Sequence, residues 1–408
     1  MLGAYYFIRK HNTSKTAALI ELMCYSIPIS WRNIFGGSFA SLPVPWFYII
    51  GALLALRLVM IKSPISKKMK WSTVFLVLVQ ISVVFLSLGP LAITKYQSSI
   101  YFTEAVGQFI TLSFYNILIL LCIAKGSLLE EKDMFRLRQA YVFGGLITSI
   151  GVIIQFSLHY FGGILIGNIE FALNRVLYLF MFIDISSGSL YLISTAFMMI
   201  LFKNDFKMSR SSYILTVGTI VIATSITSAR TGIISFFIVF SLYLFSKKGI
   251  LKKLTGFASY IVLLFVVLTF FSFVRPMDNS INYVINSSGR ISGYKIAWDL
   301  FVSNPIIGTG FGRTHTFHLM GGRAIPHLTF LQYLVQTGII YTTLIFGIIF
   351  YALIKSWKNS IKEGWVLLLT LVGSFFIPDI FSSRFILIVM LFILLNNKSV
   401  AIDLTMEE

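Results

Sequence analysis

The chain has 408 residues, of which 57% are hydrophobic and only 12% are charged. Soluble globular domains carry about 25% charged residues, so this composition excludes an ordinary soluble enzyme and indicates a chain that crosses a membrane many times. In a soluble protein the formal charge of +18 would point to nucleic acid, but here the question is on which side of the membrane each basic residue lies.

Twelve continuous apolar segments predict membrane-spanning helices and argue against a β-barrel, whose strands alternate apolar and polar residues. The segments lie at about residues 16–34, 43–61, 71–93, 100–124, 139–161, 177–202, 211–228, 231–246, 254–274, 327–354, 364–381 and 385–396. We therefore expect an all-α polytopic membrane protein with about 12 transmembrane helices in a single integral membrane domain, residues 1–408. Because the first segment follows Arg9, Lys10 and Lys15, it is predicted to be an anchor rather than a cleaved signal.

An even number of spans puts both termini on one side, and the basic residues predict that this side is the cytoplasm. In that orientation 22 of the 33 Lys and Arg residues lie in inner segments, and 18 of these are Lys. The outer basic residues are mostly Arg, whose planar guanidinium suits phosphate oxygens, so they are candidates for ligand contact as well as for interfacial anchoring. They are Arg32, Lys95, Arg175, Arg230, Arg275, Arg290, Lys295, Arg313, Arg323 and Arg384.

Residues 275–326 form the one long outer segment, and a loop of that length usually has its own structure and task. It contains a predicted helix at about 290–302 that ends at Asn304-Pro305 and is expected to lie along the outer membrane surface. The apolar face of this helix is Ile291, Tyr294, Trp298 and Phe301. A glycine-rich turn follows, Gly308-Thr-Gly310-Phe-Gly312, where the backbone could approach a ligand closely.

Two outer arginines are candidates for binding a ligand. Arg230 joins spans 211–228 and 231–246, which rise only about 27 and 24 Å, so the hairpin tip is expected just below the outer interface. An arginine there is costly unless it meets an anion or water, and the alternative is snorkelling to the interface. Arg290 is at the start of the loop helix, where the helix dipole does not stabilise a positive charge. An anion that binds both the guanidinium and the first backbone amides explains this position better than a plain surface arginine does.

His327 directly follows Pro326 at the start of a span. The positive helix end disfavours imidazolium, and a neutral imidazole can accept a proton from a sugar hydroxyl. The alternative is an interfacial histidine bonded to water. His315 and His318 are weaker candidates, because a mobile loop histidine needs no special role.

The sequence predicts no metal and no cofactor. It contains no Walker loop and no His-based metal motif, and the outer acids show no paired spacing that would hold a divalent ion. Those acids are Glu104, Glu170, Asp184, Asp278, Asp299 and Asp379. The two cysteines, Cys24 and Cys122, lie in apolar runs and are expected to be buried and unpaired.

Between residues 211 and 345 the chain resembles the O-antigen ligase and polymerase family. The matching pieces are Ser-Ala-Arg230-Thr-Gly between two spans, Arg290 before the helix that carries Trp298, and the glycine-rich run. His327 then stands eleven residues before Gly338 in Gln-Thr-Gly-Ile-Ile. Before residue 211 the similarity rests on the number and topology of the spans.

The resemblance implies a GT-C-like membrane glycosyltransferase that takes glycans from undecaprenyl pyrophosphate. It implies that Arg230 and Arg290 bind the lipid-linked pyrophosphate, with Arg175 as a further arginine, and that His327 activates the acceptor hydroxyl. Ligases usually have Asn, Ser or Gln after this histidine, whereas this chain has Leu328, which favours the polymerase branch.

We therefore expect a Wzy-type polymerase of O-antigen, capsule or exopolysaccharide in the bacterial plasma membrane, using lipid-linked repeat units as donor and acceptor, with a chain-length regulator as a possible partner. A ligase that transfers finished glycan to lipid A core is the alternative within the family. A flippase or secondary transporter is the alternative of another class, in which Glu21, Arg57 and Asp184 would line a path.

Overall fold

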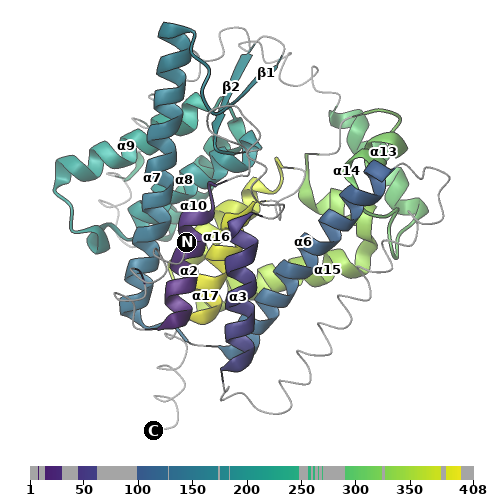
Figure 1. The fold of residues 1–408 in the computed structure, drawn as a ribbon, viewed down its shortest axis with the longest axis horizontal. Coiled ribbons are helices and arrows are strands. Elements are labelled where there is room, and N and C mark those ends of the chain that lie inside the picture. Colours follow the sequence, from purple (N-terminus) through teal and green to yellow (C-terminus); the bar gives the residue numbers. More distant parts are fainter. Residues whose placement is uncertain are drawn as a thin grey trace.

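In a computed structural model, the described residues of the protein form helices together with one β-hairpin (Figure 1). The structure describes residues 8, 14–29, 45–61, 99–126, 128–172, 175–182, 184–247, 256–258, 261, 265, 269, 290–323, 327–377 and 383–396. In chain order the elements are α2 (Lys15–Ser26), α3 (Trp46–Met60), α6 (Ser99–Lys125), α7 (Glu131–Gly162), β1 (Asn168–Ala172), β2 (Arg175–Phe180), α8 (Ile185–Leu201), the 3-10 helix η1 (Lys203–Phe206), α9 (Arg210–Ile226), α10 (Arg230–Ser246), α13 (Arg290–Ser303), α14 (Arg313–Leu319), α15 (Thr329–Lys358), α16 (Glu363–Gly373) and α17 (Arg384–Leu395).

The helices have the length and composition of a membrane protein. Among the described residues, α6 from Glu104 onward, α7 and α15 are long and apolar enough to cross a bilayer. Six further apolar helices, α3, α8, α9, α10, α16 and α17, are shorter, between 11 and 17 residues. The count of twelve spans and the GT-C-like arrangement stay predictions, because span 71–93 and most of span 254–274 lie outside the described residues.

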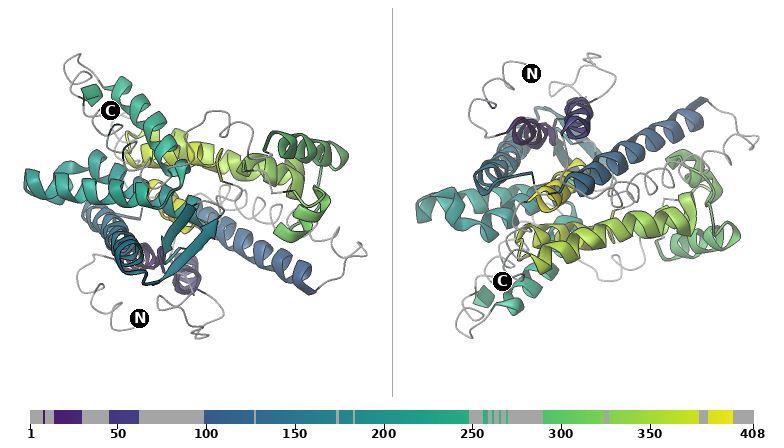
Figure 2. Two further views of the ribbon diagram at one scale, coloured as in Figure 1. Left: turned by 90° about the horizontal axis from the view of Figure 1, so that it is seen from above. Right: turned by 90° about the horizontal axis from the view of Figure 1, so that it is seen from below.

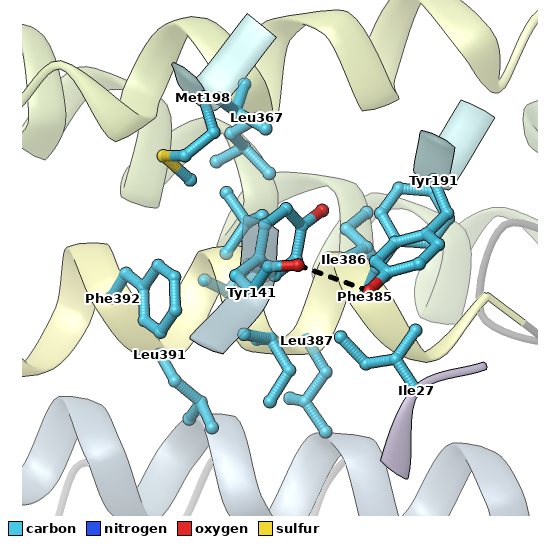
Figure 3. Close-up of a cluster of buried hydrophobic side chains, with 14 of the residues drawn as sticks. Ile27, Tyr141, Tyr191, Met198, Leu367, Phe385, Ile386, Leu387, Leu391 and Phe392 are labelled. Carbon is cyan, nitrogen blue, oxygen red and sulfur yellow. Dashed lines mark hydrogen bonds between the residues drawn. The ribbon is translucent and has the colours of Figure 1, made fainter. Parts of the chain in front are cut away.

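Helix α17 is the centre of the bundle. Eleven of its twelve residues are buried, from Phe385 to Leu395, and a helix that is apolar on every side is buried on every side. Figure 3 shows its residues Phe385, Leu387 and Phe392 among Tyr141 of α7 and Tyr191 of α8. Helices α2, α6, α15 and α16 therefore pack around a short core helix.

The outward face of α7 is apolar as well. Its exposed residues Phe143, Ile147, Ile150 and Ile154 recur at helical spacing and form one stripe away from the core. In a membrane such a stripe contacts lipid rather than water. The helix begins at Glu131, earlier than the predicted span 139–161, because acidic residues in its first turn suit the positive helix end.

The predicted span 177–202 is wrong over its first residues. Strand β2 pairs antiparallel with β1 there, and α8 begins only at Ile185. The Gln155 side chain of α7 fixes the hairpin, because its amide donates to the Ile166 carbonyl (2.6 Å) and accepts from the Phe180 N–H (3.0 Å). Asp184 then caps α8 by accepting the Ser187 N–H at 2.7 Å.

Two other spans differ from the prediction in where they end or break. Helix α16 ends at Gly373, before the end of the predicted span 364–381. Helix α15 runs from Thr329 to Lys358, but Gly338 (φ 70°, ψ −176°) interrupts it. The prediction of a helix at about 290–302 is confirmed by α13, while the outer position of residues 275–326 stays a prediction and residues 275–289 and 324–326 lie outside the described residues.

Candidate functional site

Arg230 is the first residue of α10 and is half-buried. The chain reaches it through Ser228, which is fully buried in a left-handed conformation (φ 65°), and Ala229, the N-cap. Because alanine has no acceptor, the first amides of α10 receive no side-chain cap. The sequence thus puts a guanidinium beside the positive end of a helix, an arrangement that suits an anion.

The first turn of α10 is held against the start of α8. Ser189 Oγ donates to the Ala229 carbonyl (3.4 Å), and Gly232 lies so close that a Cβ there would be 2.6 Å from the Ser189 carbonyl oxygen. The next residue of α8, Leu190, occupies the space beside Gly373 at the end of α16. The start of α10 and the end of α16 therefore lie on adjacent residues of α8.

His327 is half-buried and precedes α15, and the two residues after it are held from different sides. Thr329 donates its N–H to the Ser374 carbonyl (2.9 Å) and its Oγ1–H to the Ile377 carbonyl (2.8 Å), both just beyond α16. Leu328 packs instead into an apolar cluster with Ala297 of α13. Through α16 and α8, the structure brings the start of α15 to the same end of the bundle as the start of α10.

Arg290 begins α13, and its side chain lies outside the described residues. Helix α13 lies along the first half of α15 (Figure 2), where Ala297 and Met320 meet Leu331 and Val335. This corrects the predicted apolar face. Tyr294 and Phe301 pack on the α15 cluster, whereas Trp298 is 53% exposed, because the buried side of α13 is centred on Ala297. The side chain of Ile291 is not among those described.

Arg175 is the first residue of β2 and pairs with Ala172, and its side chain also lies outside the described residues. The hairpin packs on α7 and on the start of α8, where Phe182 lies against Gly188. Arg175 is therefore carried by an element at the same end of the bundle as Arg230. Whether the side chains of Arg175, Arg230 and Arg290 meet one ligand stays a prediction.

The glycine-rich run approaches a helix backbone in this structure. Thr309 N–H donates to the Val335 carbonyl (2.7 Å), Gly310 N–H donates to the Gln336 carbonyl (3.0 Å), and Ile339 N–H donates to the Pro305 carbonyl (2.8 Å). These bonds satisfy backbone groups that the break at Gly338 leaves without helical partners. The run therefore works as an insert that closes the gap in α15.

Hydrogen bonds between polar side chains, which were not predicted from the sequence, join the loop to α6. Glu104 accepts the N–H and the Oγ1–H of Thr314, both at 2.8 Å. Gln108 accepts the Gly312 N–H (3.2 Å) and donates to Gln336 of α15 (2.8 Å). The signal was available, because glutamines inside apolar spans are expensive unless they bond to one another.

The two loop histidines differ from each other. His315 is only 4% exposed, and its Nε2 lies 3.2 Å from the Thr309 carbonyl oxygen, so it is part of the packed loop rather than mobile. Burial, with a smaller effect from the charge of nearby His318, lowers the pKa of His315. His318 is exposed.

Comparison with protein families gives one match. Residues 208–346, about a third of the chain, match the family model described as O-antigen ligase. The matched segment includes α9, α10, α13, α14 and the start of α15, and with them Arg230, Arg290 and His327. No curated protein and no solved structure matched the chain. This match supports the assignment of residues 208–346 to the O-antigen ligase and polymerase family.

Proposed function

We propose that the protein is a glycosyltransferase of the bacterial plasma membrane that polymerises undecaprenyl-pyrophosphate-linked repeat units into O-antigen, capsule or exopolysaccharide. One observation carries the proposal. Within the family-matched segment, the start of α10 carries Arg230 and the start of α15 follows His327. The start of α10 contacts Ser189 of α8, the end of α16 contacts the next residue of α8, and the start of α15 bonds to the chain just after α16, so both helix starts lie at one end of the bundle. A cationic helix start and a histidine at a second helix start are what metal-free glycosyl transfer from a pyrophosphate requires.

On the donor side, the growing glycan is bound to undecaprenyl pyrophosphate. Arg230 and the first amides of α10 bind the pyrophosphate together with Arg290, and Arg175 adds further positive charge. As the bond between the anomeric carbon and the pyrophosphate oxygen breaks, negative charge grows on the leaving group, and the guanidinium groups stabilise it there.

On the acceptor side, a hydroxyl of the incoming lipid-linked repeat unit attacks the anomeric carbon. His327 takes the hydroxyl proton, the new glycosidic C–O bond forms, and undecaprenyl pyrophosphate leaves with the electron pair of the broken bond. A single direct displacement inverts the anomeric configuration. The contacts of Thr329 and Leu328 on either side hold the chain at His327 in place for this step.

Ligation is the second candidate, favoured by the description of the matched family, and Leu328 supports polymerisation. The residue that would be polar in most ligases packs here into the apolar cluster with Ala297. The glycan profile of a deletion strain separates the two. Single repeat units attached to the acceptor would support polymerisation, and finished polymer left on the carrier lipid would support ligation.

A reconstituted assay separates an enzyme from a transporter. Purified protein in liposomes with lipid-linked repeat units should make longer glycans without a second enzyme. Under the same conditions His327→Ala should lose polymer formation, and the control His318→Ala, an exposed histidine of the same loop, should keep it. Polymer formation by His327→Ala at the wild-type rate would contradict the role of His327.

The role of Arg290 is tested in the same way. Arg290→Ala should lower polymer formation with the protein level unchanged, and the control Arg323→Ala, which changes an exposed loop arginine, should not. An unchanged polymer length in the Arg290→Ala strain would contradict a role for Arg290 in holding the pyrophosphate.

A further inference from the structure

We propose that Gln332 binds the acceptor glycan by accepting a hydrogen bond from one of its sugar hydroxyls. The inference rests on the function proposed above and names a residue that neither the sequence analysis nor the family comparison singles out. Gln332 is on the first turns of α15, is 4% exposed, and its buried Oε1 has no hydrogen-bond partner. Buried side-chain oxygens are nearly always paired, so such an atom calls for an explanation.

The orientation of this amide follows from a chain of hydrogen bonds that starts at a backbone N–H. Gly312 N–H can only donate, so Gln108 presents its Oε1 to it (3.2 Å) and its Nε2 to Gln336 (2.8 Å). Gln336 must then present Oε1 to Gln108 and donate its own Nε2–H to Thr316 Oγ1 (3.0 Å). Gln332 donates to that same Gln336 Oε1 (3.3 Å), which leaves Gln332 Oε1 without a donor.

Turning the Gln332 amide over does not remove the unpaired oxygen. It would bring Gln332 Oε1 against Gln336 Oε1, and Gln336 cannot turn in response because Gln108 is fixed by the Gly312 N–H. The polarity of the whole group is thus set by one backbone amide, and the spare acceptor stays at Gln332.

The side-chain amide of Asn116 is also buried between α6 and α15, but its bonding partner differs from that of Gln332. Asn116 Oδ1 also has no partner, while Asn116 Nδ2 bonds to the Tyr341 hydroxyl at 2.7 Å. A hydroxyl can donate as well as accept, so the Asn116 amide can turn over and keep a bond. The contacts of Asn116 therefore do not fix a spare acceptor oxygen in the way that the contacts of Gln332 do, and Asn116 serves below as the matched control.

The place and chemistry of the spare oxygen point to the acceptor glycan. Gln332 follows Leu328 by four residues, a rise of about 6 Å, so it lies about one turn along the helix that His327 precedes. In the proposed mechanism His327 receives the acceptor hydroxyl. A lone carbonyl oxygen attracts a hydroxyl hydrogen and repels pyrophosphate oxygens, so it belongs with the acceptor sugar rather than with the donor phosphates.

The expected effect of removing this acceptor is on substrate binding. Gln332→Met keeps the length of the side chain and removes both polar atoms. If a sugar hydroxyl is left without its partner, the KM for repeat units rises roughly 5- to 150-fold, with a smaller change in kcat. Without substrate, the unfolding temperature should stay equal or rise, because an unpaired buried oxygen has been removed.

The test uses purified full-length protein and lipid-linked repeat units isolated from a strain that lacks the gene. Initial rates against repeat-unit concentration give KM and kcat for the wild type, Gln332→Met and the control Asn116→Leu. The unfolding temperature is measured with and without repeat units. We expect the wild type to be stabilised by repeat units, Gln332→Met to lose that stabilisation together with its low KM, and Asn116→Leu to keep both.

The outcomes distinguish the two proposals. Turnover by Gln332→Met with an unchanged KM would overturn the role of Gln332 alone. A lower unfolding temperature without substrate, with KM values that match those of Asn116→Leu, would also overturn it, because this pattern means that Gln332 only stabilises the fold. No turnover by the wild type would instead overturn the proposed function.

Discussion

Two arginines lie in different settings near the two ends of α16. At its start, Glu363 lies 2.8 Å from Arg138, which is 2% exposed and also meets Asp205 (2.8 Å) and Glu131 (3.3 Å). At its end, α16 shares the start of α8 with the first turn of α10, where Arg230 adds positive charge to a helix end that has no side-chain cap. Arg138 is held among three of the protein's own carboxylates, whereas Arg230 stands at a helix start where we propose that an anion binds.

This contrast also shows how the predicted inner residues are used. Lys125 Nζ donates to the Ile61 carbonyl after α3 (2.7 Å), and Lys355 Nζ donates to the Leu394 carbonyl near the end of α17 (2.9 Å). Each lysine thus bonds to carbonyls at the negative end of a helix. Arg138, Lys125 and Lys355 therefore stabilise the fold at this end of the bundle.

The largest expected effect is on stability, at Arg138. Arg138→Met removes the counter-charge of Glu363, which is 1% exposed, and should lower the free energy of unfolding by about 3–5 kcal/mol. The loss is measured as a fall in the unfolding temperature in detergent. A thiol-reactive dye reports unfolding, because Cys24 and Cys122 are both buried in the folded protein. Turnover per folded molecule should be kept. An unchanged unfolding temperature would mean that this ion-pair group does not hold α7 to α16.

The next effect is on turnover, at Arg230. On the proposed function, Arg230→Ala removes a cation from the leaving pyrophosphate and should lower kcat about 10²- to 10³-fold. Arg384→Ala is the matched contrast, because Arg384 donates to the Ile27 (3.3 Å) and Ile29 carbonyls after α2. It should lower the unfolding temperature and keep kcat. Equal losses of kcat in the two variants would remove the distinction between structural and ligand-binding arginines.

The helices near the candidate site could be predicted from the sequence because their signals are local. The apolar runs gave α9 and α10 to within a few residues, and the pattern before Asn304-Pro305 gave α13. The β1–β2 hairpin was not predicted, because the apolar run 177–202 has the composition of one continuous span. Asp184, which caps α8 and marks the true start of that helix, lies inside this run.

Contacts between distant segments could not be predicted in the same way. The run from Gly308 to Gly312 has the composition of a ligand loop, yet its amides bond to carbonyls of Val335 and Gln336, more than twenty residues later. Nothing local marks Gln108 as the partner of Gln336, 228 residues away. The candidates Arg230 and His327 stand out in the sequence from their places between two short spans and at the start of a span, whereas Gln332 becomes visible only once its neighbours are known.

The third effect tests whether the end of the bundle with Arg230 and His327 depends on the insert in α15. Gly338 has a positive φ, and a Cβ there would overlap the Ile306 carbonyl oxygen, so Gly338→Ala should cost about 1–3 kcal/mol of stability. Displacing the insert also moves the start of α15, so kcat should fall as well. The control Gly347→Ala, on the same helix with nothing within 4 Å, should change neither. Wild-type stability in Gly338→Ala would show that the break is not required.

The smallest effect is a pH dependence from His315. Burial lowers its pKa in the folded protein, so below the ordinary histidine range the unfolded chain takes up a proton that the folded chain does not. Acidification from about pH 7 to pH 5 should therefore destabilise the wild type. Above this range His315 has no effect on stability, because its side chain is neutral in both the folded and the unfolded chain. In His315→Gln the side-chain amide can still donate to the Thr309 carbonyl, so this variant should lose less stability on acidification. The unfolding temperature of both proteins across this pH range measures the difference. If the two fall in parallel, the acid sensitivity of the loop comes from another group, and the buried histidine acts in packing alone.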